Sequence, residues 1–125
     1  MSVAHIAVID DDRETRELIQ SALELEGYSA SLFSGEDGVL AQLEALAPDL
    51  IMLDIMIAGL DGYELCTLIK QSQRLQKTPV LFVSGMPVHE TEPRLRLVGA
   101  DDYLSKPFLL KLLYQKIKAL LNAKV

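Results

Sequence analysis

The sequence predicts an α/β domain with a doubly wound parallel sheet, and three observations support this prediction. Five short apolar runs, rich in β-branched residues, alternate with five longer segments that carry apolar residues at helical spacing. The runs at 50–53 and 80–83 are apolar throughout, as expected of strands that are covered on both faces. The 125 residues contain no internal repeat or low-complexity linker, so we expect one domain with right-handed crossovers.

The first half of the chain alternates three expected strands with two expected helices. The first helix has an apolar face that includes Leu18 and Leu23, and Gly27 ends it in the usual C-terminal manner. Pro48 ends the second helix before the third strand begins. The three strands are expected over residues 5–9, 28–33 and 50–54. The two helices are expected over residues 12–26 and 35–47.

The second half continues with three helices and two strands. Thr78 and Pro79 introduce the fourth strand, and Gly99 separates the fourth helix from the fifth strand. The fourth helix is weakly patterned, and we expect Pro93 in its first turn, where proline is tolerated. The first two of these helices are expected over residues 62–73 and 90–98, and the two strands over residues 80–83 and 101–104. The last helix carries a clear apolar stripe formed by Leu109, Leu112, Leu113, Ile117 and Leu120.

Composition excludes several classes of function. The net charge is −6 and no two basic residues are adjacent, so we expect no direct nucleic acid contact by this domain. Asp54 interrupts the longest apolar stretch, and we therefore expect no membrane span. Cys66 is the only cysteine, which excludes an internal disulfide and predicts a cytoplasmic location.

Four polar residues far apart in the chain each follow an apolar run that reads as a strand: Asp11, Asp54, Ser84 and Lys106. The carboxyl ends of parallel strands open into one crevice, where ligands bind in folds of this class. The sequence therefore predicts one acidic, cation-dependent phosphate site built from these residues.

The carboxylates of Asp10, Asp11 and Asp54 favour a cation site. Two ionised groups about 4 Å apart repel by ~4 kcal/mol at an effective dielectric constant of 20, so they share protons or bind a cation. All-oxygen ligation favours Mg²⁺ or Mn²⁺. An alternative stays open for Asp11, which with Glu14 fits a helix capping box.

Given a metal and a phosphate donor, Asp54 could attack phosphorus and form an aspartyl-phosphate. Lys106 would supply a positive charge for the phosphoryl oxygens, and Ser84 a hydroxyl donor. The backbone N–H groups around Ile55 and Gly85 are further candidate donors.

Four segments in this order carry a family resemblance: IAVIDDD (6–12), PDLIMLDIMIAGLDGYEL (48–65), PVLFVSG (79–85) and GADDYLSKPF (99–108). They resemble the receiver domain of two-component response regulators, which is CheY-like. The resemblance covers essentially the whole chain and implies a single receiver domain over residues 1–125, which an output domain can follow in the full protein. It also implies a flavodoxin-like (βα)₅ fold with a five-stranded sheet of order 2-1-3-4-5.

The resemblance implies a role for each matching residue. Asp54 matches the phosphoacceptor and also a metal ligand, Asp10 and Asp11 match the acidic pair that holds Mg²⁺, and Met56 matches the position whose backbone carbonyl ligates the metal. Ala58 departs from the family, which usually has proline there, and we expect this change to loosen the loop that presents Met56.

Other matching residues concern phosphate binding and switching. Lys106 matches the phosphate-binding lysine, and Pro107 matches a proline preceded by a cis peptide bond. Ser84, followed by the supporting Gly85, matches the switch hydroxyl, and Tyr103 matches the aromatic switch that moves inward with it. A second departure lies at residues 86–94, which carry two prolines and leave the length and motion of the fourth helix open.

The function implied is a phosphoacceptor in a phosphorelay, a signalling protein rather than a turnover enzyme. The donor histidine should belong to a sensor histidine kinase or phosphotransfer protein, because no histidine here lies in an expected helix that suggests a phosphohistidine carrier. The output surface should include the fourth helix, fifth strand and fifth helix. We also hypothesise a phosphorylation-promoted homodimer through that surface, involving Leu110, Tyr114, Lys116, Lys118, Asp101 and Asp102.

Two alternatives come from other classes. One is a phosphohydrolase of the haloacid-dehalogenase type with Asp54 as nucleophile, but such enzymes have a second aspartate two positions on, where this chain has Met56. The other is a phosphorylation-independent interaction module on the same fold, which would be expected to lack one of Asp11, Asp54 or Lys106. All three residues are present.

Overall fold

The structure is a computed structural model that describes residues 3–57 and 60–123. Its centre is a five-stranded sheet in which every pairing is parallel. The strands run in the order β2-β1-β3-β6-β7, which confirms the expected order 2-1-3-4-5 once a separate hairpin takes the labels β4 and β5. The five strands are β1 (His5–Ile9), β2 (Ser29–Phe33), β3 (Leu50–Leu53), β6 (Val80–Ser84) and β7 (Asp102–Ser105).

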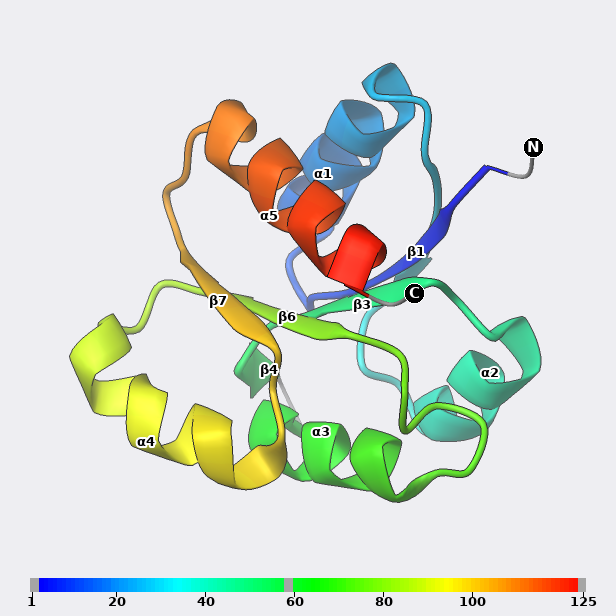
Figure 1. Ribbon diagram of the computed structural model, residues 1–125, viewed down its shortest axis with the longest axis vertical. Coiled ribbons are helices and arrows are strands. Elements are labelled where there is room, and N and C mark those ends of the chain that lie inside the picture. The colour runs from blue at the N-terminus through cyan, green and yellow to red at the C-terminus, as the bar shows by residue number, and fades with distance from the viewer. Residues whose placement is uncertain (1–2, 58–59, 124–125) are drawn as a thin grey trace.

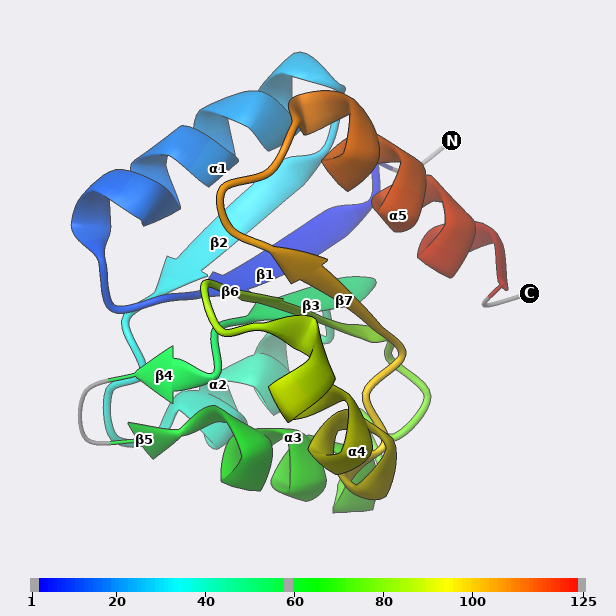
Figure 2. The same cartoon turned by 90° about the vertical axis from the view of Figure 1, so that its left-hand side faces the viewer.

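Helices cover both faces of the sheet, as Figures 1 and 2 show. One face carries α1 (Arg13–Leu25) and α5 (Leu110–Ala123). The other face carries α2 (Val39–Leu46), α3 (Gly62–Gln71) and α4 (Val88–Val98). No helix among the described residues has the length and apolar character needed to cross a membrane.

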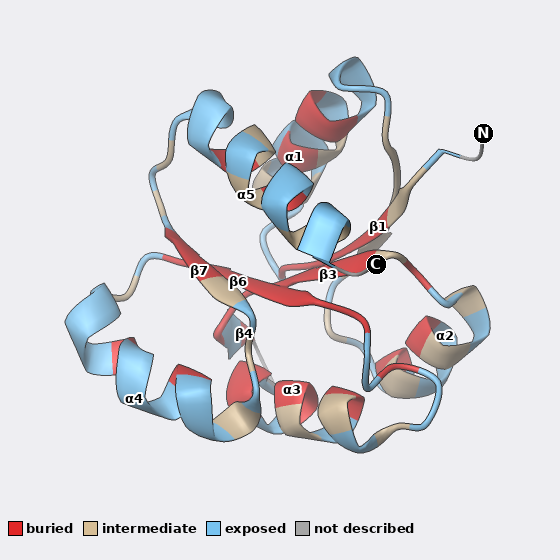
Figure 3. Ribbon diagram, viewed as in Figure 1, coloured by how far each residue is buried: buried red, intermediate tan, exposed pale blue. Residues whose placement is uncertain are grey.

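The core therefore has two layers, one on each side of the buried strands (Figure 3). Alternate residues of each strand point to opposite layers, which explains the continuous apolar runs in the sequence. Ile51 and Phe82 lie in the layer beneath α2, α3 and α4, and Met52 and Leu81 lie in the layer beneath α1 and α5. Cys66 is fully buried in the first layer, which confirms its assignment as a core residue.

Helix α2 is shorter than expected, beginning at Val39 instead of residue 35. Gly35 and Gly38 have φ angles of 85° and 83°, and this left-handed conformation does not continue a right-handed helix. Helix α3 ends two residues before the expected end, at Gln71.

Helix α4 begins two residues earlier than expected, and the prediction that Pro93 lies in its first turn is wrong. Pro93 is the sixth residue of the helix and has no N–H to donate to the carbonyl of His89. The hydroxyl of the fully buried Thr91 donates to the carbonyl of Val88 at 3.1 Å, which adds one bond to the first turn.

A short antiparallel hairpin between β3 and α3 was not expected from the sequence. It consists of β4 (Met56–Ile57) and β5 (Leu60–Asp61), in which Met56 pairs with Asp61. Strands of two residues are too short for a pattern of alternating polarity to show them. The departure noted at Ala58 lies outside the described residues.

Candidate functional site

Three carboxylates meet at the carboxyl edge of the sheet. Asp10 and Asp11 follow β1 and Asp54 follows β3, and each offers one carboxylate oxygen within 4.8 Å of the others. Asp10 and Asp54 are buried, with 3% and 9% of their surface exposed, whereas Asp11 is exposed. An all-oxygen set with one ligand open to solvent fits Mg²⁺ or Mn²⁺, which keep several waters.

Lys106 follows the edge strand β7 and reaches this cluster along the same carboxyl edge of the sheet. Its Nζ atom donates to Asp10 Oδ2 at 2.6 Å and to Asp54 Oδ2 at 3.2 Å. Burial alone would lower the pKa of Lys106, but the hydrogen bond to Asp10 and the charges of both carboxylates outweigh it and raise that pKa. The ammonium is therefore held in its charged form between the two buried aspartates.

The charge at this edge is still unbalanced, because one ammonium faces three carboxylates. Burial raises the pKa of Asp54 above its ordinary value; Lys106 opposes this rise and the charge of Asp10 adds to it. Ionisation of Asp54 is thus less favourable here than in water, and a further cation would offset that effect. The arrangement has the chemistry of a site that binds a divalent cation.

The turn after β1 settles which aspartate caps α1. Asp12 is the N-cap: its carboxylate accepts hydrogen bonds from the Thr15 N–H at 3.2 Å and from the Thr15 hydroxyl. Asp10 Oδ1 in turn accepts the N–H of Asp12 at 2.9 Å. Because Asp12 supplies the cap, the capping interpretation of Asp11 is wrong.

The loop after Asp54 is held against the start of α3. The N–H of Met56 donates to Asp54 Oδ1 at 3.3 Å, and the N–H of Gly62 donates to the carbonyl of Ile55 at 3.0 Å. A β-carbon on Gly62 would lie 2.8 Å from the Cα atom of Ile55, so only glycine fits. Sequence reasoning assigned no role to Gly62, although the residue lies within a quoted motif.

Ser84 and Tyr103 are linked through the loop that follows β6. Ser84 is buried and its Oγ accepts the N–H of Met86 at 3.3 Å. The hydroxyl of Tyr103, also buried, donates to the carbonyls of Ser84, at 3.2 Å, and Met86.

Two further residues of the predicted site lie in turns after strands. The peptide bond between Lys106 and Pro107 is cis, as the family resemblance implied. Gly85 lies in the loop that follows β6, where an added β-carbon would meet nothing within 4 Å.

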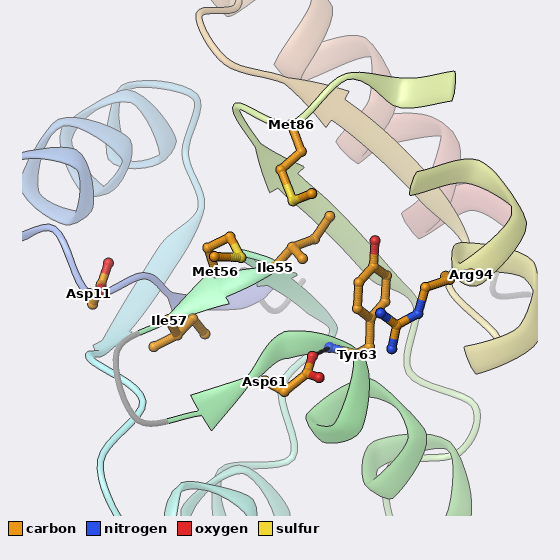
Figure 4. A pocket seen from close by; sticks show the side chains of 8 residues that line it. All are labelled: Asp11, Ile55, Met56, Ile57, Asp61, Tyr63, Met86 and Arg94. Carbon is orange, nitrogen blue, oxygen red and sulfur yellow. Dashed lines mark hydrogen bonds between the residues drawn. The ribbon is translucent and has the colours of Figure 1, made fainter. Parts of the chain in front are cut away.

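A cavity of about 540 Å³ opens beside the carboxylates (Figure 4). Asp11 and Met56 line one side, and the Tyr63 ring lies on the other with the guanidinium of Arg94 4.0 Å from its centroid. Met86 also lines the cavity. Tyr63 and Arg94 were not singled out from the sequence, because only the fold brings α3 and α4 together.

The expected output surface is only partly arranged as hypothesised. The hydroxyl of Tyr114 donates to the carbonyl of Ala22 in α1 at 2.9 Å, and Leu110 lines a groove between α1 and α5. Both side chains therefore face α1 rather than α4, which contradicts their expected place. The two aspartates pair within the chain: Lys116 Nζ lies 3.0 Å from Asp102 Oδ1, and Lys70 Nζ lies 2.9 Å from Asp101 Oδ2. Lys118 lines a separate cleft with Tyr114.

Comparisons with known proteins agree with this geometry. The family model described as "Response regulator receiver domain" matches residues 6–118. The nisin biosynthesis regulatory protein NisR of Lactococcus lactis is 36% identical over 94% of this chain and 50% of its own length. The DNA-binding dual master transcriptional regulator RpaA of Synechocystis is also 36% identical, over 94% of this chain and 48% of its own length. The chain thus spans about half the length of these curated relatives.

Solved structures give the same result. The crystal structure of a putative response regulator from Chloroflexus aurantiacus superposes with a TM-score of 0.91 at 26% identity, covering 97% of this chain and 99% of that one. The chain is therefore similar in fold to this solved protein over nearly its full length.

Proposed function

The chain belongs to the response regulator receiver domain family, and from this premise we propose that it is a phosphoacceptor switched by phosphorylation of Asp54. Receiver domains of this family are the signalling switches of two-component systems. The donor would be the phosphohistidine of a sensor histidine kinase or a phosphotransfer protein. The observation that carries this proposal is the convergence of Asp10, Asp11, Asp54 and Lys106 at the carboxyl edge of the sheet.

Transfer would begin when a carboxylate oxygen of Asp54 attacks the phosphorus of the phosphohistidine. An O–P bond forms, the P–N bond breaks, and the electron pair of that bond stays on the imidazole nitrogen. Lys106 would move from the carboxylates to the phosphoryl oxygens, where its charge is needed as negative charge accumulates. The Ser84 hydroxyl, at the end of the adjacent strand, would donate to another phosphoryl oxygen.

The carboxylates of Asp10, Asp11 and Asp54, with the backbone carbonyl of Met56, would hold Mg²⁺ or Mn²⁺, which neutralises phosphoryl oxygens when bound. Asp10 and Asp54 are fixed by their bonds to Lys106, and Asp54 also by the Met56 N–H. The carboxylates of Asp10 and Asp54 are therefore already oriented before a cation binds.

Phosphorylation would reach α4 through Ser84 and Tyr103. A phosphoryl group that accepts a bond from the Ser84 hydroxyl would draw residues 84–86 toward Asp54. Tyr103 would follow, because its hydroxyl is bonded to two carbonyls of that segment. The result is a two-state surface on α4, β7 and α5 whose populations the phosphoryl group shifts.

The donor protein would dock over the groove between α1 and α5. This groove of about 320 Å³ is lined by Lys106 and Pro107 of the site and by apolar side chains that include Leu18, which is 66% exposed. A partner that covers Leu18 would therefore stand next to Lys106. Continuity between an apolar surface and the reacting groups favours this face for the phosphohistidine donor.

A phosphorylation-promoted homodimer through α4, β7 and α5 is proposed with a changed set of residues. A groove on that face is lined by Val88, Glu92, Arg96 and Lys116 among others, and Leu97 of α4 is 85% exposed. Charges of both signs would suit a self-complementary contact between two copies. Sedimentation that shows only monomer with saturating beryllofluoride at high concentration would contradict this proposal.

The first experiment is incubation of the protein with Mg²⁺ and acetyl phosphate, followed by comparison of the intact masses of wild type and Asp54→Asn. A phosphoryl adduct in wild type alone, abolished by a chelator, is the expected result. Absence of an adduct from folded protein would favour the phosphorylation-independent interaction module. Steady turnover of phosphate esters would instead favour the phosphohydrolase.

A further inference from the structure

Arg16 of α1 is bound to the backbone of the acidic turn. Its Nη1 atom donates to the carbonyl oxygen of Asp10 at 2.7 Å, and the contact is partly buried. The Arg16 N–H is already used within the helix, where it donates to the carbonyl of Asp12 at 3.0 Å. The guanidinium therefore ties α1 back to the end of β1.

The contacts of Asp10 show why this tie matters. Its N–H donates to the carbonyl of Phe33 at 3.1 Å, and its carboxylate accepts from the Asp12 N–H and from Lys106 Nζ. The Asp10 carbonyl is the remaining polar group of the residue, and Arg16 is its donor. Because Asp10 is only 3% exposed, water is a poor substitute for that donor.

The bonded carbonyl belongs to the peptide group between the two neighbouring carboxylates. A peptide group is planar, so a donor that fixes its carbonyl also fixes the direction of the N–H of Asp11. One contact thus limits the rotation of Asp10 about ψ and of Asp11 about φ. The relative placement of the two adjacent candidate metal ligands depends on that rotation.

Arg16 also lies near the loop that follows β2. Its charge is among the influences that lower the pKa of Glu36, after the larger effect of hydrogen bonds from Ser34.

We propose that Arg16 is a positioning residue for metal binding, which holds the peptide group between Asp10 and Asp11 in the orientation that lets both carboxylates bind one cation. This inference rests on the proposed function, because it concerns the same Mg²⁺ site. Hydrogen-bond partners that orient metal ligands without touching the metal typically increase metal affinity ten- to a hundredfold.

A positioning role and a purely electrostatic role of Arg16 predict opposite changes in Mg²⁺ affinity when the side chain is replaced. Removal of a positive charge near three carboxylates would by itself strengthen cation binding. Loss of the hydrogen bond to the Asp10 carbonyl would weaken it. A fall in Mg²⁺ affinity on replacing Arg16 can therefore not come from the charge change alone.

The test is isothermal titration of Mg²⁺ into wild type, Arg16→Gln, Arg16→Lys and Arg13→Gln. Arg13 is the matched control, because it is on the same helix and its guanidinium pairs with Glu17 in solvent, with its side chain 82% exposed. We expect Arg16→Gln to bind Mg²⁺ about tenfold more weakly, Arg16→Lys to recover part of the loss, and Arg13→Gln to bind at least as tightly as wild type. Thermal unfolding without metal identifies any loss of fold.

Equal or tighter binding by Arg16→Gln would overturn the inference, as would an equal fall in Arg13→Gln. If wild type itself binds no Mg²⁺, the proposed function fails, and amide hydrogen exchange at Asp11 and Asp12 then decides whether Arg16 holds the peptide group between Asp10 and Asp11. Faster exchange at these two amides in Arg16→Gln than in Arg13→Gln would support positioning, and equal rates would refute it.

Discussion

Gly62 is in direct backbone contact with the residue that we propose as phosphoacceptor. A β-carbon at this position would lie 2.8 Å from the Cα atom of Ile55 and closer still to the carbonyl oxygen of Asp54. The first turn of α3 therefore rests on the backbone that carries the reacting carboxylate, and Asp61 caps that turn by accepting the Tyr63 N–H at 2.8 Å.

Gly62→Ala should displace the Asp54 loop. The new methyl group would meet backbone atoms that cannot rotate away, so we expect a loss of about 1–3 kcal/mol in the free energy of unfolding and slower phosphorylation by acetyl phosphate. Gly27→Ala is the control: its φ of 90° is strained for alanine, but an added β-carbon meets nothing within 4 Å. Denaturant unfolding and phosphorylation rates should show that only Gly62→Ala affects both. Normal phosphorylation in Gly62→Ala would refute this account.

Lys106→Met should bind Mg²⁺ more tightly than wild type while failing as a switch. The ammonium binds one carboxylate oxygen each of Asp10 and Asp54, which are two of the three candidate metal ligands, and so it competes with a cation for their negative charge. Its removal eliminates that competition, and we expect roughly a tenfold gain in Mg²⁺ affinity, or about 1.4 kcal/mol. Titration calorimetry measures the gain in Mg²⁺ affinity. Beryllofluoride binding should weaken, because the variant lacks the positive charge of Lys106 that would bind the fluorides. Weaker Mg²⁺ binding by the variant would contradict the assigned geometry.

Tyr103→Phe should uncouple α4 from the site without preventing phosphorylation. The change removes the one hydroxyl proton that the carbonyls of Ser84 and Met86 share, which should cost about 0.5–1.5 kcal/mol. Amide chemical shifts of α4 on beryllofluoride addition report the coupling, and they should change less than in wild type. Tyr114→Phe loses a comparable bond to Ala22 on the other face and should leave the response intact. Equal responses in the two variants would argue against a switch role for Tyr103.

Strands β3 and β6 were the most predictable part of the fold, because their runs at 50–53 and 80–83 are apolar throughout, each preceded by aspartate or proline and followed by a polar residue. The beginning of α2 was not, since only the positive φ of Gly35 and Gly38 shows that the helix cannot extend through them. Similarly, Tyr114 lies beside the apolar stripe of the amphipathic helix α5. Sequence periodicity does not say which side of that stripe contacts α1.

In the candidate site, the side chains at strand ends followed from the topology, because parallel strands align their carboxyl ends. The contact between Gly62 and Asp54 did not follow, since it depends on how closely α3 approaches a loop of irregular backbone. The same limit applies to Arg16, whose target is a carbonyl group and not a side chain with a recognisable pattern.

Leu18→Lys should slow phosphorylation by a protein donor while leaving phosphorylation by acetyl phosphate unchanged. Leu18 lines the groove beside Lys106 and Pro107 and is 66% exposed, so a charge there disrupts a partner contact but not the core. We expect at least a tenfold loss in the second-order rate with the cognate phosphohistidine protein. Leu25→Lys, on the last residue of α1 and 83% exposed, is the matched control and should transfer normally. An equal effect of both variants would place the docking surface elsewhere.

The pH dependence of stability should differ between wild type and Asp54→Asn in metal-free buffer. Burial raises the pKa of Asp54 in the folded protein above 3.8, the ordinary value that applies to the unfolded chain. Between these two values the folded state binds more protons, so stability falls as the pH rises through that window. Above that window wild type carries the full penalty of an ionised Asp54, whereas the amide carries none.

We therefore expect Asp54→Asn to be the more stable protein at pH 7 without metal, with a difference that shrinks on acidification and vanishes below about 3.8. Saturating Mg²⁺ should reverse the order, because binding at a hundred times the dissociation constant stabilises wild type by about 2.7 kcal/mol and the variant lacks one ligand. Thermal unfolding at several pH values, with and without Mg²⁺, measures both effects. A wild type that is more stable than Asp54→Asn at pH 7 in the absence of metal would show that Lys106 already compensates Asp54 in full.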